Sequence, residues 1–313
     1  MKTAVVANLA SDAGKTGRRW NHLCSAIENR LGPVEVCFTE SVGHAEDLTR
    51  NLLRRGFDRI IGVGGDGTFN EIANGFIEND RPVRPGAVMG IVPAGTGGDL
   101  RRSLEMPSSP EQAIEVLATG VPFEIDLGKI TFEAHSGGPN TRYFVNLTSL
   151  GMGGEVSARA KNALKILGGQ AAFFWATLKV IATYRGRHVE LELDGEASGS
   201  YKVLNVAVGN GPFHGGGMHV CPDAVLHDGI LNVTVIDDLS LLTLLRDNKY
   251  LYDGNIYNHP KIRHFRAQRI VATSPEETRI EVDGEPLGRL PVEIIVLPRA
   301  MHVVVPRNSR LLV

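Results

Sequence analysis

Two glycine-rich segments contain the residues whose types and spacing could bind phosphate. Residues 64–68 read Gly-Gly-Asp-Gly-Thr after the apolar run 59–63, and residues 93–100 read Pro-Ala-Gly-Thr-Gly-Gly-Asp-Leu after a second apolar run. A glycine-rich turn between a buried strand and a helix directs several backbone N–H groups and the positive end of the helix dipole to one point. We expect both turns to face one crevice and to hold a polyphosphate.

Side chains in these turns add oxygen atoms to the predicted phosphate site. Asp66 places a carboxylate within reach of a phosphate-bound Mg²⁺. The hydroxyl groups of Thr68 and Thr96 can donate hydrogen bonds to phosphate or cap their helices, and the sequence favours neither role.

A third candidate segment lies late in the chain, where residues 280–286 read Ile-Glu-Val-Asp-Gly-Glu-Pro. Asp-Gly between alternating apolar residues is an ordinary hairpin turn. A second Asp-Gly-Glu, at 194–196, is interpreted as such a turn and nothing more. Local pattern alone therefore favours a structural turn at 283–285 as well.

The first third of the chain alternates strand-like and helix-like segments. We predict strands at 4–8, 34–39, 60–63 and 87–92, and helices ending at Leu31 and spanning 43–55 and 110–118. Repeated β-α units with unbroken apolar strands imply a mostly parallel sheet covered on both faces. Ligands of such sheets gather at the carboxyl ends of the strands, where Asn8, Thr39, Gly64 and Pro93 fall.

After Pro122 the pattern changes to alternation of period two with turn residues between short segments. This predicts an antiparallel β-sandwich or barrel-like domain with strands at 123–132, 143–149, 188–194, 201–209, 230–236, 264–273, 279–282 and 292–296. Helical insertions are expected at 154–184 and 240–252. The predicted organisation is an α/β domain over 1–122 that carries the predicted phosphate site, a β-rich domain over 123–297, and a segment 298–313 that returns to the first domain.

Composition excludes several classes of protein. The 313 residues carry a formal charge of −2, which gives no case for a nucleic-acid binder. Three cysteines without a pairing rhythm fit a reducing cytoplasm, and because Met1 leads directly into a strand-like segment we expect no signal peptide. The most apolar helix candidate, 171–184, is too short to span a bilayer, so any membrane contact is expected to be peripheral.

Five motifs occur in the order found in the diacylglycerol kinase catalytic family, which the chain resembles over nearly its whole length. They are the turn at 64–68, Gly95-Thr96 with Asp99, Ile125-Asp126-Leu127-Gly128, Asp228-Gly229 and Val282-Asp283-Gly284-Glu285-Pro286. The family includes bacterial lipid kinases, sphingosine kinases and ceramide kinases. The resemblance implies an NAD-kinase- and phosphofructokinase-like α/β domain, and transfer of phosphate from ATP, with Mg²⁺, to a lipid alcohol such as diacylglycerol, which would give phosphatidic acid.

The resemblance also implies roles for individual positions. The ATP site would comprise Gly64, Gly65, Asp66, Gly67, Thr68 and Asn70, with Asn8, Thr39, Gly95 and Thr96 close by. Asp283 and Glu285 match the catalytic acidic pair, and Glu285 matches the residue usually taken as proton acceptor. A structural Mg²⁺ site would comprise Asp228 and the backbone oxygens of Val225 and Ile230, while Mg²⁺ and its waters would be tied to the cleft by Asp66, Asp99 and Asp126.

One position departs from the family pattern. Gly98 stands where the family commonly has Asn before the aspartate of the second turn. The change removes an amide donor, although glycine keeps the turn feasible and is expected to expose its own N–H.

A lipid acceptor is expected to approach between the two domains, from a membrane surface. A candidate insertion face comprises Phe173, Phe174, Trp175, Leu178, Val180 and Ile181, with Lys161, Lys165 and Lys179 towards headgroups. Packing of this helix on the β-rich domain explains the same residues equally well. The basic run at 259–269 is also open to both interpretations, and a homodimer stays open.

Two other functions fit parts of the pattern. NAD kinases and phosphofructokinases share the Gly-Gly-Asp-Gly turn, so a kinase for a soluble acceptor is the first alternative, with Asn70-Glu71 as a weak counterpart of an acceptor-binding pair. The second is a nucleotide-sensing protein that transfers nothing, for which Gly98 is the main support.

Overall fold

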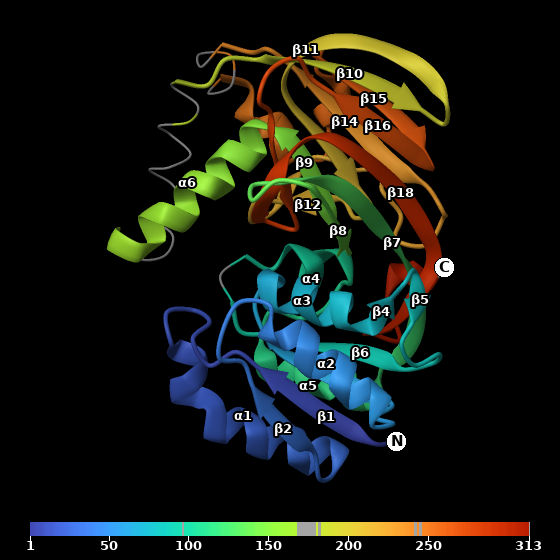
Figure 1. The fold of residues 1–313 in the computed structure, drawn as a ribbon. Coiled ribbons are helices and arrows are strands. Elements are labelled where there is room, and N and C mark those ends of the chain that lie inside the picture. The colour runs from blue at the N-terminus through green and yellow to red at the C-terminus, as the bar shows by residue number, and fades with distance from the viewer. Residues whose placement is uncertain (96, 168–179, 181–182, 241–242, 244–245, 313) are drawn as a thin grey trace. The chain divides into compact units, whose positions relative to one another are not determined.

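The computed structural model describes residues 1–95, 97–167, 180, 183–240, 243 and 246–312. The chain folds into two compact units: unit 1 comprises Met1–Leu127 and Leu297–Val313, and unit 2 comprises Gly128–Val296 (Figure 1). The chain crosses from one unit to the other twice, within strand β7 (Val121–Ala134) and within strand β18 (Glu285–Val305). The last residues of the chain therefore belong to unit 1.

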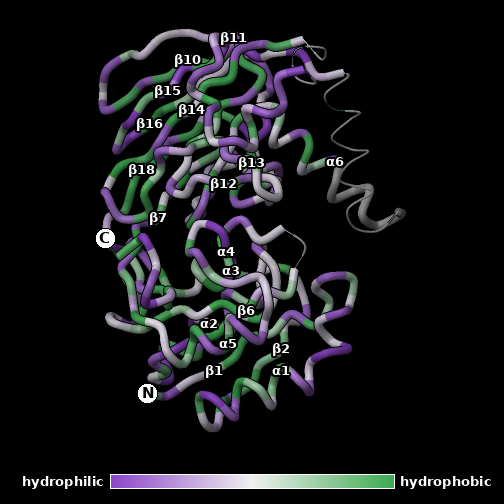
Figure 2. Tube along the Cα trace, turned by 180° about the vertical axis from the view of Figure 1, so that it is seen from behind, coloured by the Kyte–Doolittle hydropathy of each residue, from purple (hydrophilic) through white to green (hydrophobic). Residues whose placement is uncertain are grey.

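Unit 1 is built on a parallel sheet in the strand order β2-β1-β3-β6-β18. Its strands are β1 (Thr3–Ala7), β2 (Glu35–Phe38), β3 (Arg59–Gly64), β6 (Val88–Pro93) and the end of β18, and each neighbouring pair is parallel. Residues in β1, β3 and β6 are almost all buried, and Figure 2 shows the labelled strands β1 and β6 as mostly hydrophobic. Their carboxyl ends share one edge, as the unbroken apolar runs predicted.

Helices cover both faces of this sheet. They are α1 (Lys15–Leu31), α2 (His44–Arg54), α3 (Asp66–Phe76), α4 (Asp99–Ser103) and α5 (Pro110–Thr119). Gly62 lies under α3, since a Cβ there would be 2.7 Å from the Ile72 side chain, and Gly90 lies under α5, since a Cβ there would be 2.6 Å from Leu117. Gly90 pairs with Ile61 and not with Gly62, so these two glycines face opposite sides of the sheet. A short hairpin, β4 (Ile77–Glu78) with β5 (Arg81–Pro82), follows α3.

Unit 2 is an antiparallel, sandwich-like domain whose described residues include one α-helix, α6 (Met152–Leu167), and two short 3₁₀ helices, η1 (Asn248–Leu251) and η2 (Ile256–Asn258). Its strands, besides parts of β7 and β18, are β8 (Pro139–Phe144), β9 (Leu147–Gly151), β10 (Arg187–Leu193), β11 (Glu196–Gly209), β12 (Phe213–His214), β13 (Met218–His219), β14 (Leu231–Asp237), β15 (Ile262–Ala267), β16 (Arg269–Thr273) and β17 (Arg279–Val282). Pairing runs β11-β10-β16-β18-β17-β9 and returns to β11, so the strands close a ring. A core of Val, Ile, Leu and Phe fills it.

Three predicted elements differ from the structure. The strand predicted at 264–273 is two strands, β15 and β16, because the chain changes partners at Gln268: β15 pairs with β14, whereas β16 pairs with β10 and β18. The strand predicted at 292–296 is the middle of the 21-residue strand β18, which continues through its prolines. The strand predicted at 143–149 is likewise divided between the end of β8 and the start of β9. The segment predicted as helical at 240–252 is helical at the described residues 243 and 246–251, and it ends in the short 3₁₀ helix η1 (Asn248–Leu251).

Candidate active site

In unit 1 the two glycine turns follow strands β3 and β6 and touch each other. A Cβ on Gly95 would lie only 2.5 Å from the Cα of Gly65, a distance that no side chain tolerates. The backbone N–H of Ala94 donates to the carbonyl oxygen of Gly64 at 2.7 Å, which joins the two turns directly. The sequence prediction that both turns lie at one edge of the sheet is therefore confirmed within unit 1, and the glycines are needed for the close approach.

The N-terminus of α3 lies in the first of these turns and has no side-chain cap. Its N-cap residue is Gly65, whose backbone is extended and which supplies no capping side chain. Gly64 packs against Thr68 so tightly that a Cβ would be 2.7 Å from the Thr68 hydroxyl oxygen. The first N–H groups of a helix have no partner within the helix and carry its positive dipole end. This helix end can accordingly bind an anion such as a phosphate.

The second turn is organised by Asp66. The carboxylate of Asp66 accepts hydrogen bonds from the backbone N–H groups of Gly98 at 2.7 Å, Asp99 at 3.2 Å and Leu100 at 3.2 Å. A Cβ on Gly97 would lie 2.5 Å from Asp66 Oδ2, so glycine is required there too. Asp66 thus caps α4 and fixes the second turn to the first.

This arrangement corrects one expectation about Gly98. Its N–H is not exposed for a ligand, because it donates to Asp66 Oδ2. Gly98 has a φ of 78°, in the left-handed region that glycine and asparagine both adopt readily. The departure from the family pattern at this position therefore leaves a backbone shape that Asn would also allow.

Burial shapes the electrostatics of this pair of turns. The pKa of Asp66 is raised because the carboxyl group is buried and because the Asp99 carboxylate lies nearby, although the three N–H donors lower it in part. Asp99 is itself paired with Arg102, with 3.0 Å between Oδ1 and Nη1. Arg102 also donates to the carbonyl oxygen of Gly97.

A chain of polar side chains links the end of β1 to the same edge. The Asn8 amide donates to the Thr68 hydroxyl at 3.2 Å, and the Ser11 hydroxyl donates to the Asn8 carbonyl oxygen at 2.8 Å. The hydroxyl oxygen of Thr16 lies 2.6 Å from that of Ser11 and 3.0 Å from the carbonyl oxygen of Ala94, and its single proton can be donated to one of them at a time. Sequence reasoning missed Thr16, whose only signal was a hydroxyl group in the first turn of the helix that follows this strand end.

The other predicted nucleotide-site residues of unit 1 are distributed as follows. Thr39 follows β2 at the same edge, and its N–H donates to Ala7. Thr96 lies outside the described residues. Asn70 is buried within α3, where its backbone and side-chain oxygens accept from the Asn74 amide. Glu71 accepts the N–H groups of Gly43 and Ala45, so it caps α2.

In unit 2 the late acidic segment forms a two-residue hairpin turn between β17 and β18. Asp283 and Gly284 have φ values of 45° and 88°, and Val282 pairs with Glu285 across the turn. The Asp283 carboxylate accepts three backbone N–H groups, with donor distances of 2.8 to 3.1 Å, from residues 145–147. Asp283 therefore ties this turn to the strand end before β9.

The earlier copy of the motif forms the same turn between β10 and β11. Asp194 and Gly195 have φ values of 52° and 90°. Oδ1 of Asp194 accepts the N–H groups of Gln268 and Arg269, while Glu196 is exposed. The prediction of an ordinary hairpin turn at 194–196 is confirmed, and the two copies provide an internal comparison.

Comparison with known proteins places these features in a family. Residues 2–130 match the family described as the diacylglycerol kinase catalytic domain, and residues 146–305 match the YegS C-terminal NAD kinase beta sandwich-like domain. The chain is 30% identical over 273 residues to a diacylglycerol kinase of Bacillus subtilis (strain 168), covering 87% of this chain and 85% of the relative. The chain belongs to the diacylglycerol kinase family. Its resemblance to that family, inferred from five motifs, is confirmed.

Other relatives and solved structures agree with this membership. A diacylglycerol kinase of Staphylococcus saprophyticus is 30% identical over 272 residues, covering 87% of this chain and 85% of the relative. A Bacillus anthracis structure of the diacylglycerol kinase type has a TM-score of 0.76 at 22% identity and covers 98% of each chain. Yeast NADH kinase has a TM-score of 0.58 at 12% identity, covering 98% of this chain and 85% of the enzyme. The last two likenesses confirm the fold, and the family membership makes this chain a kinase.

Two of the acidic residues predicted to bind Mg²⁺ already have hydrogen-bond partners: Asp126 accepts a backbone N–H group, and Asp228 accepts a backbone N–H group and pairs with an arginine. Asp126 is fully buried, and its Oδ1 accepts the N–H of Arg299 at 2.7 Å. Asp228 Oδ1 accepts the N–H of Ile230, and Oδ2 lies 2.6 Å from a guanidinium nitrogen of Arg266. Among the residues that the structure describes, no group of three or more His, Cys, Asp or Glu could hold a metal ion.

The residues considered for membrane contact either lie outside the described part of the chain or, in several cases, form ion pairs with acidic side chains. The insertion face lies outside the described residues except for Val180, which is buried, and the side chains of Lys161 and Lys165 are likewise outside them. In the basic run 259–269, Arg263 pairs with Asp237, and Arg269 pairs with both Glu192 and Glu293. Within the described residues, no helix is long and apolar enough to cross a bilayer.

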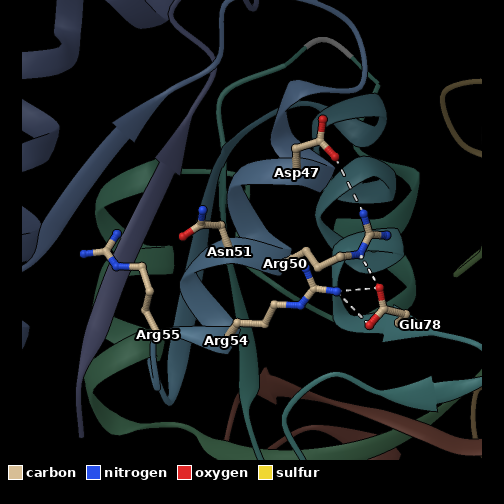
Figure 3. Close-up of a pocket in the computed structure, with 6 residues that line it drawn as sticks. All are labelled: Asp47, Arg50, Asn51, Arg54, Arg55 and Glu78. Atoms are coloured by element: carbon tan, nitrogen blue, oxygen red, sulfur yellow. Dashed lines mark hydrogen bonds and ion pairs between the residues drawn. The ribbon is translucent and has the colours of Figure 1, made fainter.

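A hollow of about 490 Å³ lies on the surface of unit 1 along α2, and none of the predicted site residues lines it. It is lined by Asp47, Arg50, Asn51, Arg54, Arg55 and Glu78, as Figure 3 shows. Its arginines already have acidic partners: Arg54 pairs with Glu78 at 2.6 Å, and Arg55 pairs with Glu35 at 2.6 Å. We assign no role in catalysis to this hollow.

Proposed function

We propose that this protein transfers a phosphoryl group from ATP, with Mg²⁺, to the hydroxyl group of a lipid alcohol, most simply diacylglycerol, and so makes phosphatidic acid. The observation that supports this most strongly is the contact between Gly65 and Gly95 beside the uncapped N-terminus of α3. Relatives that match most of the chain are named diacylglycerol kinases, which supports the choice of acceptor.

The donor site would use backbone groups more than side chains. The N–H groups at the start of α3, in the turn of Gly65, Asp66 and Gly67, would hold the terminal phosphates. Asp66 would act indirectly, because three N–H groups already occupy its oxygens and it holds the second turn in place. Phosphoryl transfer depends on such positioning and on charge stabilisation more than on covalent chemistry of the protein.

Glu285 would be the general base, with Asp283 as the residue that fixes it. The three backbone donors on the Asp283 carboxylate stabilise its ionised form and occupy its oxygens, which makes it a poor proton acceptor. Glu285 directly follows the two-residue turn, as the first residue of β18. A general base of this kind contributes roughly 10²- to 10⁴-fold to the rate.

The residues assigned to Mg²⁺ fit that ion by donor chemistry. Asp228 with the carbonyl oxygens of Val225 and Ile230 offers oxygen ligands only, as Mg²⁺ prefers, and because the Arg266 guanidinium lies 2.6 Å from Oδ2, Mg²⁺ would bind through Oδ1 or replace this ion pair. Asp66, Asp99 and Asp126 also offer only oxygen atoms, and three N–H donors leave one of the roughly four acceptor positions of the Asp66 carboxylate. When bound, Mg²⁺ would neutralise part of the phosphate charge.

A lipid acceptor implies work at a membrane surface, and we propose a cytoplasmic enzyme that contacts the membrane peripherally. The rival acceptor, a soluble nucleotide such as NAD, would draw on Asn70 and Glu71. In the structure Asn70 is buried and Glu71 caps α2, so neither observation favours that rival. The non-catalytic alternative loses its main support, because Gly98 keeps the turn attached to Asp66.

The experiment is a substrate panel with γ-labelled ATP. Purified protein is incubated with diacylglycerol, sphingosine and ceramide in mixed micelles, and separately with NAD and sugar phosphates. Label in phosphatidic acid is expected. Label in NADP would assign the soluble acceptor instead, and ATP binding without transfer to any acceptor would assign a nucleotide sensor.

A further inference from the structure

Glu281 is a fully buried carboxyl group that the proposed reaction has not used. It lies on β17, two residues before Asp283, and none of its surface is exposed. Ser149 lies opposite it on β9, and Nε2 of His214, on β12, lies 3.5 Å from its Oε1. Burial raises the pKa of Glu281, although His214, Ser149 and the N–H of Gly284 lower it in part. Burying an ionisable group costs free energy, so its presence calls for a reason.

One oxygen of Glu281 holds the turn that leads to Glu285. Oε2 accepts the N–H of Gly284 at 2.6 Å. The pairing of β17 with β18 shifts register between Ile280 and Glu281, and the pairing of β10 with β11 shifts at the matching position, between Leu191 and Glu192. A β-bulge therefore precedes both copies of the turn and does not distinguish them. Glu281 is therefore linked by one hydrogen bond to the backbone between Asp283 and Glu285.

The other oxygen of Glu281 faces Ser149 and His214. Oε1 of Glu281 and the hydroxyl oxygen of Ser149 are both buried and form no hydrogen bond of ordinary geometry among the described residues, although Ser149 is close enough to lower the pKa of Glu281 in part. Oε1 also lies 3.5 Å from Nε2 of His214, whose side chain is 18% exposed. Glu281 therefore has two polar neighbours on this side and a firm hydrogen bond only on the other, from Gly284.

The second copy of the motif shows that the turn does not need this burial. Residues 192–196 read Glu-Leu-Asp-Gly-Glu and residues 281–285 read Glu-Val-Asp-Gly-Glu. Both turns have the same backbone shape, yet the Glu192 side chain is 42% exposed and pairs with Arg269 at 2.7 Å. A buried glutamate beside a histidine is thus an addition at the second copy alone, and turn formation does not explain it.

We propose that Glu281 is a positioning residue for the phosphoryl transfer: it fixes Glu285 through the hydrogen bond that it accepts from the Gly284 N–H. The inference rests on the proposed function. A hydrogen bond to an ionised carboxylate is stronger than one to a neutral carboxyl group. Protonation of Glu281 therefore loosens the turn as pH falls, and the titratable groups that act on Glu281 are His214 and Asp283.

The kinetic test compares Glu281→Gln with the matched control Glu192→Gln. Glu281→Gln is expected to lower kcat about tenfold or more, with the KM for ATP unchanged, because the base is misplaced and the donor site is intact. It should also remove the contribution of Glu281 to the fall of kcat at low pH. Glu192→Gln should do neither. A wild-type kcat and pH profile in Glu281→Gln would overturn the proposal while leaving the proposed function in place.

A second measurement needs no activity. The amide proton resonance of Gly284 should move as Glu281 titrates, with a midpoint above the ordinary glutamate value of about 4.3. In Glu281→Gln this titration should disappear, and in Glu192→Gln it should persist. A Gly284 amide that does not respond to pH in the wild-type protein would overturn the proposal even if that variant fails to fold. If the wild-type protein transfers no phosphate, the proposed function fails, and the Gly284 titration still decides whether Glu281 holds the turn.

Discussion

Replacement of Gly95 by alanine should separate the two glycine turns and weaken nucleotide binding. The new Cβ would lie 2.5 Å from the Cα of Gly65 and 3.2 Å from its nitrogen, both backbone atoms. Carbon atoms in contact prefer separations of about 3.5–4.0 Å. The turns must therefore move apart by roughly 1 Å, at a cost typical of overpacking, about 1–3 kcal/mol.

The same displacement would shift the N-terminus of α3 away from the phosphates. A misplacement of about 1 Å can cost on the order of 100-fold, so we expect at least a tenfold loss of affinity for Mg²⁺-ATP in calorimetric titration. Gly56→Ala is the control: Gly56 has a φ of 82° and no neighbour within 4 Å, so alanine there strains the backbone without touching the site. Equal ATP affinity in Gly95→Ala and wild type, with both folded, would refute the reasoning.

Four further predictions concern stability and pH. Asp283→Asn should lower the free energy of unfolding, measured with denaturant, by about 1–3 kcal/mol, because both oxygens of Asp283 accept backbone N–H groups and asparagine keeps only one oxygen. Asp194→Asn should lower it by less, because both N–H donors of Asp194 use the same oxygen, which asparagine retains. Phe144→Ala should cost about 3–5 kcal/mol, because its ring is fully buried and packs directly over Gly128; a smaller loss in denaturant titration would mean that the ring is not packed in the core. Cys221 is buried, and burial raises its pKa to about 12, whereas Cys24 and Cys37 are only partly buried. Cys24 and Cys37 should therefore react with a thiol reagent at pH 8, while Cys221 should react only after unfolding. Early reaction of Cys221 would show that it is accessible in the folded protein. Burial raises the pKa of Glu281 in the folded protein above its value in the unfolded chain. Between these two pKa values the folded protein binds more protons, so the free energy of unfolding falls as pH rises through this range. Glu281→Gln should flatten this part of the plot of unfolding free energy against pH, and an unchanged slope would contradict the buried ionisable carboxyl group.

Local sequence pattern was enough to predict the α/β domain and the two glycine turns. Strands β1, β3 and β6 are unbroken apolar runs, and the glycines at 64, 65 and 95 follow them directly. The division of 264–273 at Gln268 was not predictable, because both halves have strand-like composition and only pairing with distant strands separates them.

Local sequence pattern could not predict the hydrogen-bond partners of the site residues. Asp66 accepts hydrogen bonds from backbone N–H groups 32 to 34 positions later in the sequence, and Asp283 accepts them from backbone N–H groups more than 130 positions earlier. Glu192 and Glu281 have the same local pattern, yet one is half exposed and the other completely buried. Such differences arise from tertiary packing, since hydrogen-bond partners and burial are set by residues that are remote in sequence.

The account is tested most directly by measuring the rate of transfer from labelled ATP to diacylglycerol in micelles for Glu285→Gln and its matched control Glu196→Gln, with ATP affinity measured in parallel. Glu285→Gln is expected to lower kcat by roughly 10²- to 10⁴-fold while ATP still binds. Glu196→Gln, altered at the exposed copy of the same turn, is expected to behave as wild type. Labelled phosphatidic acid formed by Glu285→Gln at the wild-type rate would contradict the assignment of Glu285 as the base.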